Sequence, residues 1–374
     1  MITADDPPAG SSGVLSDLEL IVHPPVDDMS PQGRGQFQAS LVAMQALISS
    51  LVALTPKRGT DISATKFGGA ADLFVSPQGS SAFDSGQIQV TAGLSYPALA
   101  QIRSGAAYKR FDRALQATNS DKIKAYAMGS GGAGHAPEYW DACRRRTEGI
   151  ISVGRLEITD DHRDILASVM SLIVQIPISA WLNRGNLPYP KAAALLMART
   201  DFSAIIRKMP WPLGKLVSEY HSWNEMLLGV VNQFVPQQLK ESDRIFPSAF
   251  STKGVPQLRL TLGEWFSGMG RELPVDRLTE EDYPSSLGKS EAAAVEGLGA
   301  FREKVDPGQR PIYEFRGLKS VTWDHLADVG LGFWDYIADA HANYESTQSV
   351  PSRPSAPLVH NNVFGNPTIG SENL

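Results

Sequence analysis

The sequence contains a single cysteine, Cys143, among 374 residues. One cysteine excludes an intrachain disulfide and any zinc site that needs two or more thiolates. A strong excess of positive charge is also lacking, because 34 Lys and Arg residues stand against 40 Asp and Glu residues. The sequence has no Asn-X-Ser/Thr sequon with X other than proline. Its first residues, MITADDPPAGSSG, hold acids and prolines where a signal peptide has basic and apolar residues, so we expect no export.

The composition is that of a globular chain with many loops. Hydrophobic residues make up 42 % and charged residues 20 %, which permits a substantial core. The 33 glycines and 25 prolines predict an unusual share of loops and turns around that core. At roughly 100 to 200 residues per domain, the length is typical of two or three structural units or of one large irregular unit.

Composition divides the chain into two arms and a body. Residues 1–36 form an acidic, Pro-rich N-terminal arm, and residues 346–374 form a Pro-rich C-terminal arm. Two disordered tails are the alternative, but the C-terminal arm keeps the apolar residues Leu358, Val359, Val363, Phe364 and Ile369. We therefore expect it to dock onto a neighbouring molecule. Residues 37–345 form the mostly helical body, with a loop-rich subdomain near residues 246–322.

Two segments of the body are unusually apolar. Residues 37–54 are apolar over most of the helical circumference, which predicts a buried helix. Residues 165–182 approach the lower length limit of a membrane span, but Gln175 and Pro177 interrupt them. We expect a core helix kinked at Pro177, and a membrane-associated protein that uses residues 165–182 is the alternative.

The remaining periodicity predicts more helix than strand. Further helices are expected at residues 97–115, 190–199, 213–234, 236–245, 290–305 and 324–344. Strands are expected at residues 18–22, 65–75, 87–94, 149–159 and 312–321. No strand–helix alternation runs long enough for a doubly wound sheet. The predicted fold class is therefore mainly α with minor β (α+β), a large helical body with extended terminal arms.

Two glycine patterns resemble phosphate-binding loops without their context. Residues 129–134 have the Gly-X-Gly-X-X-Gly spacing, but the preceding KIKAYAM is polar for a buried strand, which favours a surface turn. Residues 288–290 resemble the end of a P-loop, but Tyr283 stands where its first glycine is required. We expect no cofactor.

The candidate reactive side chains also favour structural roles. His162 lies among acids that suit a helix N-terminus as well as a general base. Cys143 precedes three arginines that would lower its pKa, but no His and Asn partners are recognisable. The histidines lack metal-ligand spacing. We expect no enzyme; the alternative is an intracellular enzyme or effector whose site assembles from distant residues, including Asp161, His162 and Cys143.

One local surplus of positive charge suggests a nucleic-acid contact. Residues 101–150 contain nine basic and five acidic residues in a chain of net charge −6. The candidate contacts are Lys109, Arg110, Arg113, Arg144, Arg145 and Arg146. Lys109 and Arg113 are four residues apart, so on a helix they would share a face and meet a phosphate backbone together. The alternative is a solvated face, or pairing with acidic segments such as residues 261–300.

The layout as a whole resembles the coat proteins of small double-stranded RNA viruses, the partitivirus-like group. A Pro-rich, non-basic N-terminal segment, with DDPPAGSSG and HPPVDD, leads into a long helical body represented by PWPLGKLVSEYHSWNEMLLGVVNQFVP. The resemblance implies an icosahedral shell of paired subunits that encloses genome and polymerase, found as a virion in the host cytoplasm. Its partners would be copies of itself and RNA, with no membrane.

The charge of the N-terminal arm bears on the kind of genome. Coats that condense single-stranded RNA commonly use strongly basic arms, whereas an acidic arm repels RNA. A stiff duplex inside a preformed wall needs fewer neutralising contacts. The expected function is therefore a structural, self-assembling protein, a capsid subunit around double-stranded RNA.

Overall fold

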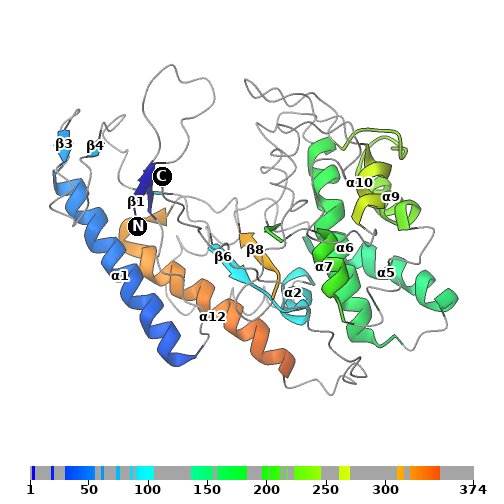
Figure 1. Ribbon diagram of the computed structural model, residues 1–374, viewed down its shortest axis with the longest axis horizontal. Helices are drawn as coiled ribbons and strands as arrows, with labels where there is room; N and C mark the ends of the chain where they lie inside the picture. Colours follow the sequence, from blue (N-terminus) through cyan, green and yellow to red (C-terminus); the bar gives the residue numbers. More distant parts are fainter. Residues whose placement is uncertain are drawn as a thin grey trace, which may run out of the picture.

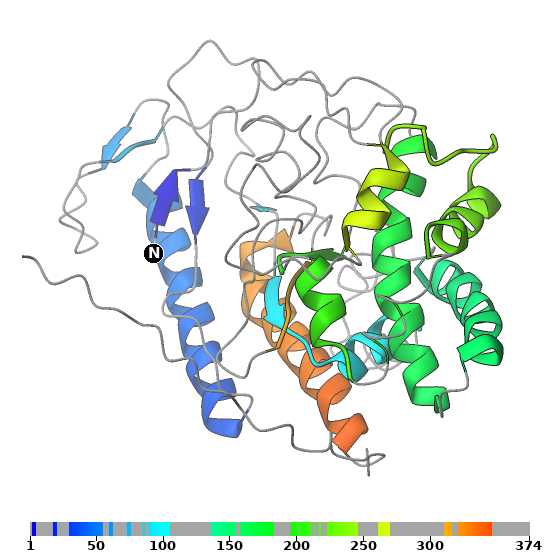
Figure 2. The same cartoon turned by 45° about the vertical axis from the view of Figure 1, so that its right-hand side comes forward.

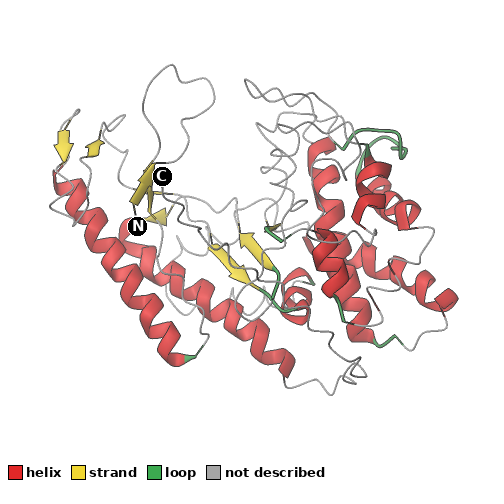
Figure 3. Ribbon diagram, viewed as in Figure 1, coloured by secondary structure: helices red, strands yellow, loops and turns green. Residues whose placement is uncertain are grey.

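The structure is a computed structural model. It describes residues 2–4, 18–20, 30–54, 60–62, 73–75, 85–86, 90–104, 136–154, 158–182, 196–200, 202–210, 213, 217, 223–245, 261–269, 310–315 and 321–345. Helix accounts for 75 % of the interpretable residues, and the strands are short (Figure 3). This confirms the predicted class, mainly α with minor β.

A three-stranded antiparallel sheet lies between two groups of helices (Figure 1). Its strands are β6 (Val90–Gly93), β8 (Ile312–Phe315) and β7 (Leu196–Ala198), with β8 in the centre. Phe315 is opposite a residue on each neighbour, Val90 on β6 and Leu196 on β7. The sheet therefore joins three segments that are far apart in the sequence.

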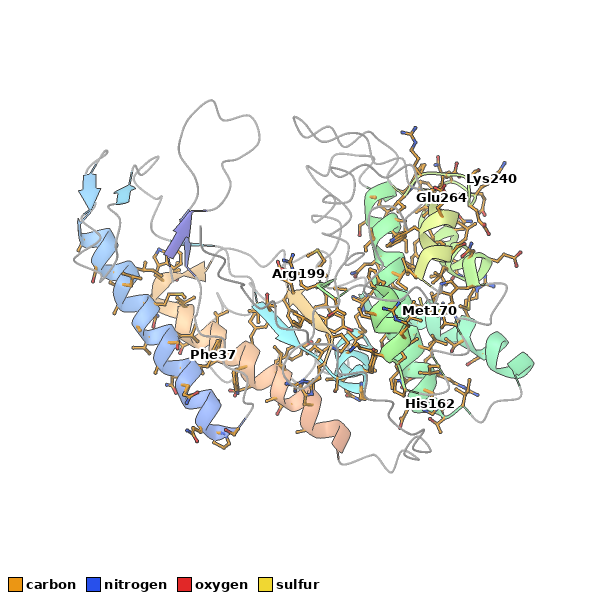
Figure 4. The ribbon with its side chains drawn as sticks, viewed as in Figure 1. Phe37, His162, Met170, Arg199, Lys240 and Glu264 are labelled. Atoms are coloured by element: carbon orange, nitrogen blue, oxygen red, sulfur yellow. The ribbon has the colours of Figure 1, made fainter. Side chains whose placement is uncertain are left out.

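The larger helical group is built around α6 (Asp160–Leu182). Its neighbours are α5 (Ala136–Gly154), α2 (Tyr96–Arg103), α9 (Trp223–Phe234), α7 (Phe202–Lys208) and strand β7, and α10 (Leu262–Met269) packs on α9 and α7. Leu166, Val169 and Leu172 of α6 are 0 % exposed. Met170, also fully buried, marks this core in Figure 4. Neighbours on several sides explain why α6 is apolar all round.

Helix α6 is also the one described helix that is long and apolar enough to cross a membrane. Its apolar window is 83 % buried inside the protein, which favours the core helix over the membrane span. The helix continues through Pro177 to Leu182, although proline cannot donate a backbone hydrogen bond.

The smaller group pairs α1 (Pro31–Leu54) with α12 (Leu326–Glu345), which follows the 3-10 turn η5 (Trp323–His325). The two helices run antiparallel at one side of the molecule (Figures 1 and 2). The other face of α12 meets α2, so α12 connects α1 to the main body. Leu41 and Ile48 of α1 form a small separate core with Leu326.

The prediction that residues 37–54 form a buried helix is right about the helix and wrong about its burial. Leu41 and Ile48 are buried, but Val42 is 51 % exposed and most other described side chains of α1 are exposed or half-buried. The physical reason is that α12 and η5 cover one side of α1.

Three local predictions are corrected. The strand expected at residues 149–159 is wrong, because α5 continues to Gly154. The helix expected at 190–199 is wrong in its last residues, which form β7 and pair with β8. The helix expected at 236–245 is a series of turns, in which the Asn232 amide donates to the Leu239 carbonyl (3.0 Å) and accepts from its N–H (2.8 Å).

The remaining described strands form short antiparallel pairs. They are β1 (Ile2–Ala4) with β2 (Leu18–Leu20), β3 (Thr60–Ile62) with β4 (Leu73–Val75), and β5 (Ser85–Gly86) with β9 (Val321–Thr322). Residues 31–36, assigned from sequence to the N-terminal arm, are the first turns of α1. The predicted helix at 290–305 and the C-terminal arm lie outside the described residues. The described parts of residues 246–322 include α10 and β8, which pack into the body, and the proposed subdomain stays a prediction.

Candidate functional site

Of the predicted nucleic-acid contacts, the three arginines on α5 are described, and the first of them is bound within the protein. Arg144 Nε donates to Asp164 Oδ1 on α6 at 2.7 Å, and its Nη2 lies 3.6 Å from Asp160. Its guanidinium also lies 5.9 Å from the centroid of the Trp140 ring. Burial raises the pKa of Asp164, an effect that the hydrogen bond from Arg144 opposes. Arg144 thus holds α5 against α6, and a phosphate would have to compete with Asp164 for it.

Arg145 and Arg146 are exposed on the same helix. The Arg146 guanidinium lies over α9, where a Cβ added to Gly229 would be 3.3 Å from its Nη2. The solvent side of α5 also carries the exposed acids Glu138, Asp141 and Glu148, so both signs of charge occur there. The described part of the predicted patch therefore consists of two exposed arginines in a mixed surface.

The described part of residues 101–150 adds no further exposed base from the predicted contacts to Arg145 and Arg146. Lys109, Arg110 and Arg113 lie outside them. Arg103, counted among the nine bases of residues 101–150, is 2 % exposed. Its guanidinium donates to the Ser171 hydroxyl (2.8 Å), the Ser171 carbonyl (3.1 Å) and the Gln175 side-chain oxygen (3.0 Å). Arg103 therefore joins α2 to α6 inside the core, which its sequence context did not predict.

The structure gives His162 a capping role at the start of α6. The backbone N–H of His162 donates to the Thr159 hydroxyl, and the backbone N–H of Thr159 donates to His162 Nδ1, each at 3.3 Å. This reciprocal pair is a capping box with histidine in the place of Glu or Gln. Burial lowers the pKa of His162, although Asp161 opposes the shift. The residue that caps α6 is therefore Thr159.

Cys143 is fully buried in α5. Burial raises the pKa of its thiol well above the usual value, and the nearby charge of Arg103 opposes this shift only in part. The sequence suggested that the following arginines would lower this pKa, and that suggestion is wrong because the thiol faces the core. A protonated, buried thiol is unsuited to nucleophilic attack.

A second candidate surface in the described structure is the exposed side of α1, which we call the outer face. It comprises Gly35, Gln36, Gln38, Ala39, Val42, Ala43, Ala46, Ser49, Ser50 and Ala53. None of these residues is charged. The Ser50 hydroxyl donates to the Ala46 carbonyl of the same helix at 2.9 Å, which reduces the polarity of the face further. The charged residue of α1, Arg34, makes two bonds to the Asp335 carboxylate, at 2.6 and 2.8 Å.

The sequence contained a signal for this face that was misinterpreted. An apolar helix without charges predicts burial, and that inference holds if the burying partner is another molecule.

Among the described residues, no group of three or more His, Cys, Asp or Glu side chains is placed to hold a metal ion. The structure brings Asp161 and His162 together with Asp160 at the start of α6, whereas Cys143 faces the core. Comparison with protein-family models, with curated proteins and with solved structures finds no match.

Proposed function

We propose that this chain is a self-assembling structural protein, the capsid subunit of a small double-stranded RNA virus. The observation that supports self-assembly is the outer face of α1, which extends about 27 Å from Gly35 to Ala53 without a charged residue. A surface helix normally turns charged residues to solvent, and a face of small and uncharged residues without them favours an interface.

The choice of a duplex genome rests on charge. The acidic N-terminal arm would repel RNA, and the described basic surface on α5 amounts to Arg145 and Arg146. So modest a patch suits a coat that encloses a stiff duplex better than one that condenses a single strand. In this proposal the protein acts in the virion and in the host cytoplasm, with copies of itself and RNA as partners.

Assembly is tested by size-exclusion chromatography and negative-stain electron microscopy of the purified full chain. Closed particles tens of nanometres across would support the proposal. A stable monomer of 40.5 kDa at high concentration would contradict it.

The RNA contact is tested with Arg145→Glu/Arg146→Glu, compared with wild type in nucleic-acid content per particle. We expect that content to fall by at least about two-fold, because two phosphate contacts are lost, with particle yield unchanged. Arg144→Glu is the matched control, since it places a carboxylate beside Asp164 and should lower stability instead. An equal loss of assembly and RNA in the double variant would indicate a structural role for these arginines.

A further inference from the structure

Helix α1 packs against α12 and η5 along one side. Its inner side stacks Phe37 on Trp334 with ring centroids 5.1 Å apart, and the Gln45 amide donates to the Trp323 carbonyl at 2.6 Å. On the opposite side, Val42 is 51 % exposed within the single chain. Covering such a face removes apolar surface from water without burying a charge, which favours association.

We propose that the outer face of α1 is the docking site for residues 354–371 of a second copy of this chain. The inference rests on the proposed self-assembly and names the surface through which one subunit receives its neighbour's C-terminal arm. The described chain ends at Glu345, the last residue of α12, and residues 346–374 follow it.

The composition of this segment matches the face. Between Arg353 and Glu372 the sequence has no Asp, Glu, Lys or Arg. It carries five large apolar side chains, whereas Val42 is the one large apolar side chain among the exposed residues of the face; the five are Leu358, Val359, Val363, Phe364 and Ile369. Most side chains of the face are small, so large apolar side chains can approach the helix closely.

The length of residues 354–371 is also sufficient to span the outer face of α1. The outer face extends from Gly35 to Ala53, about 27 Å at 1.5 Å per helical residue. Eight or nine extended residues, at about 3.3 Å each, span that distance. Residues 354–371 are therefore long enough to cover the face, and residues 346–353 remain as a connection between subunits.

Two other occupants fit less well. Residues 1–30 include Asp5, Asp6, Asp17, Glu19, Asp27 and Asp28, and burying these acids on an apolar face would be unfavourable. A second α1 would place two faces of small residues together and bury little apolar area.

The surface area that one arm would bury on one outer face predicts the strength of that contact. A strip about 27 Å long and about 10 Å wide covers roughly 270 Å² per partner, a third of the ~800 Å² of a stable interface. One arm on one face is therefore weak, and the contact becomes strong when many arms act together in a closed assembly.

Disulfide cross-linking between full-length variants tests the assignment. Ala43→Cys and Val359→Cys are made in separate chains, mixed and oxidised, and the native Cys143 does not compete because it is fully buried. We expect a linked dimer on a non-reducing gel, at least about ten-fold stronger than with the control Lys240→Cys in place of Ala43→Cys. Lys240 is exposed and lies on the far side of the molecule from Phe37 and α1 (Figure 4).

Three results would overturn the assignment. Linking of Ala43→Cys to itself would make a second α1 the occupant. A bond within one chain carrying both cysteines, without linked dimer, would make the chain's own arm the occupant. A yield equal to that of the Lys240→Cys control would mean that the segment does not dock on α1.

A charge placed on the face supplies a second readout. In the Ala43→Cys background, Ala46→Glu keeps a good helix former but brings a carboxylate into the contact, and cross-linking should fall at least about ten-fold. Gln233→Glu on α9, also exposed, is the matched control and should change nothing. If particles form but the cross-link does not, this inference is refuted and the proposed self-assembly is not. If the cross-link forms but particles do not, the proposed shell is refuted and the docking site is still supported.

Discussion

Helices α1 and α6 are nearly equal in length, with 24 and 23 residues, and both are apolar. Their surroundings differ. Leu166, Val169 and Leu172 of α6 are 0 % exposed, with helices on several sides, whereas α1 is covered along one side by α12 and η5. The comparison shows that the apolar character of a helix predicts that it will be covered, but does not say whether its own chain or another supplies the cover.

The largest expected effect comes from truncating a core side chain of α6. Leu172→Ala should lower the free energy of unfolding by about 2–5 kcal/mol, because it leaves a cavity among packed neighbours. Val42→Ala on the outer face of α1 is the matched variant and should change stability by less than about 0.5 kcal/mol. Urea unfolding followed by circular dichroism measures both.

Similar losses in these two variants would show that α1 is as well packed as α6 in the isolated subunit. The outer face would then not be free to receive a neighbour, and both the corrected burial of α1 and its docking role would fail.

The same two helices show how far sequence reasoning reaches. The sequence predicts both helices because periodicity is local, and it predicts a core position for residues 165–182 because nothing polar but Gln175 and three serines interrupts them. The exposure of α1 depends on which segments pack against it, which the pattern of α1 itself does not contain. The same reason explains residues 196–198, where pairing with β8 overrides a helical pattern.

The candidate site was predictable to a lesser degree. Arg144 and Arg103 are both among the nine bases of residues 101–150, and Arg144 is a predicted nucleic-acid contact. The structure separates them, because Arg144 meets Asp164 and Arg103 enters the core beside Ser171. Charge counting along the chain cannot distinguish a solvated arginine from one that bonds to a residue distant in sequence.

The second prediction compares one arginine from each helix group. Arg103→Met should cost about 1–3 kcal/mol, since it leaves the buried oxygens of Ser171 and Gln175 without this donor. Arg34→Met should cost about 1 kcal/mol or less, because the Arg34 and Asp335 side chains are 40 % and 45 % exposed and water replaces the bond. Urea unfolding of both variants measures the difference in unfolding free energy, read from the midpoints if the dependence on urea concentration is the same.

A cost for Arg34→Met equal to that for Arg103→Met would contradict this comparison. It would mean that the ion pair between α1 and α12 is as important to the fold as the buried polar contacts between α2 and α6.

The smallest expected effect concerns the caps of the two helices. Ser30 caps α1 by accepting from the Gly33 N–H at 3.2 Å and does not titrate, whereas His162 belongs to the cap of α6. The pKa of His162 is lowered from its usual 6.5 by burial, so below that pH the unfolded chain binds a proton that the folded chain resists. Stability should therefore fall as the pH drops from 7 to 5.

His162→Gln isolates this contribution, because glutamine occupies the same position in an ordinary capping box and has no charge to gain. The difference in unfolding free energy between wild type and this variant should shrink or change sign between pH 7 and pH 5. Parallel pH profiles would show that His162 is not shielded from protonation, and the cap of α6 would then be as insensitive to pH as the cap of α1.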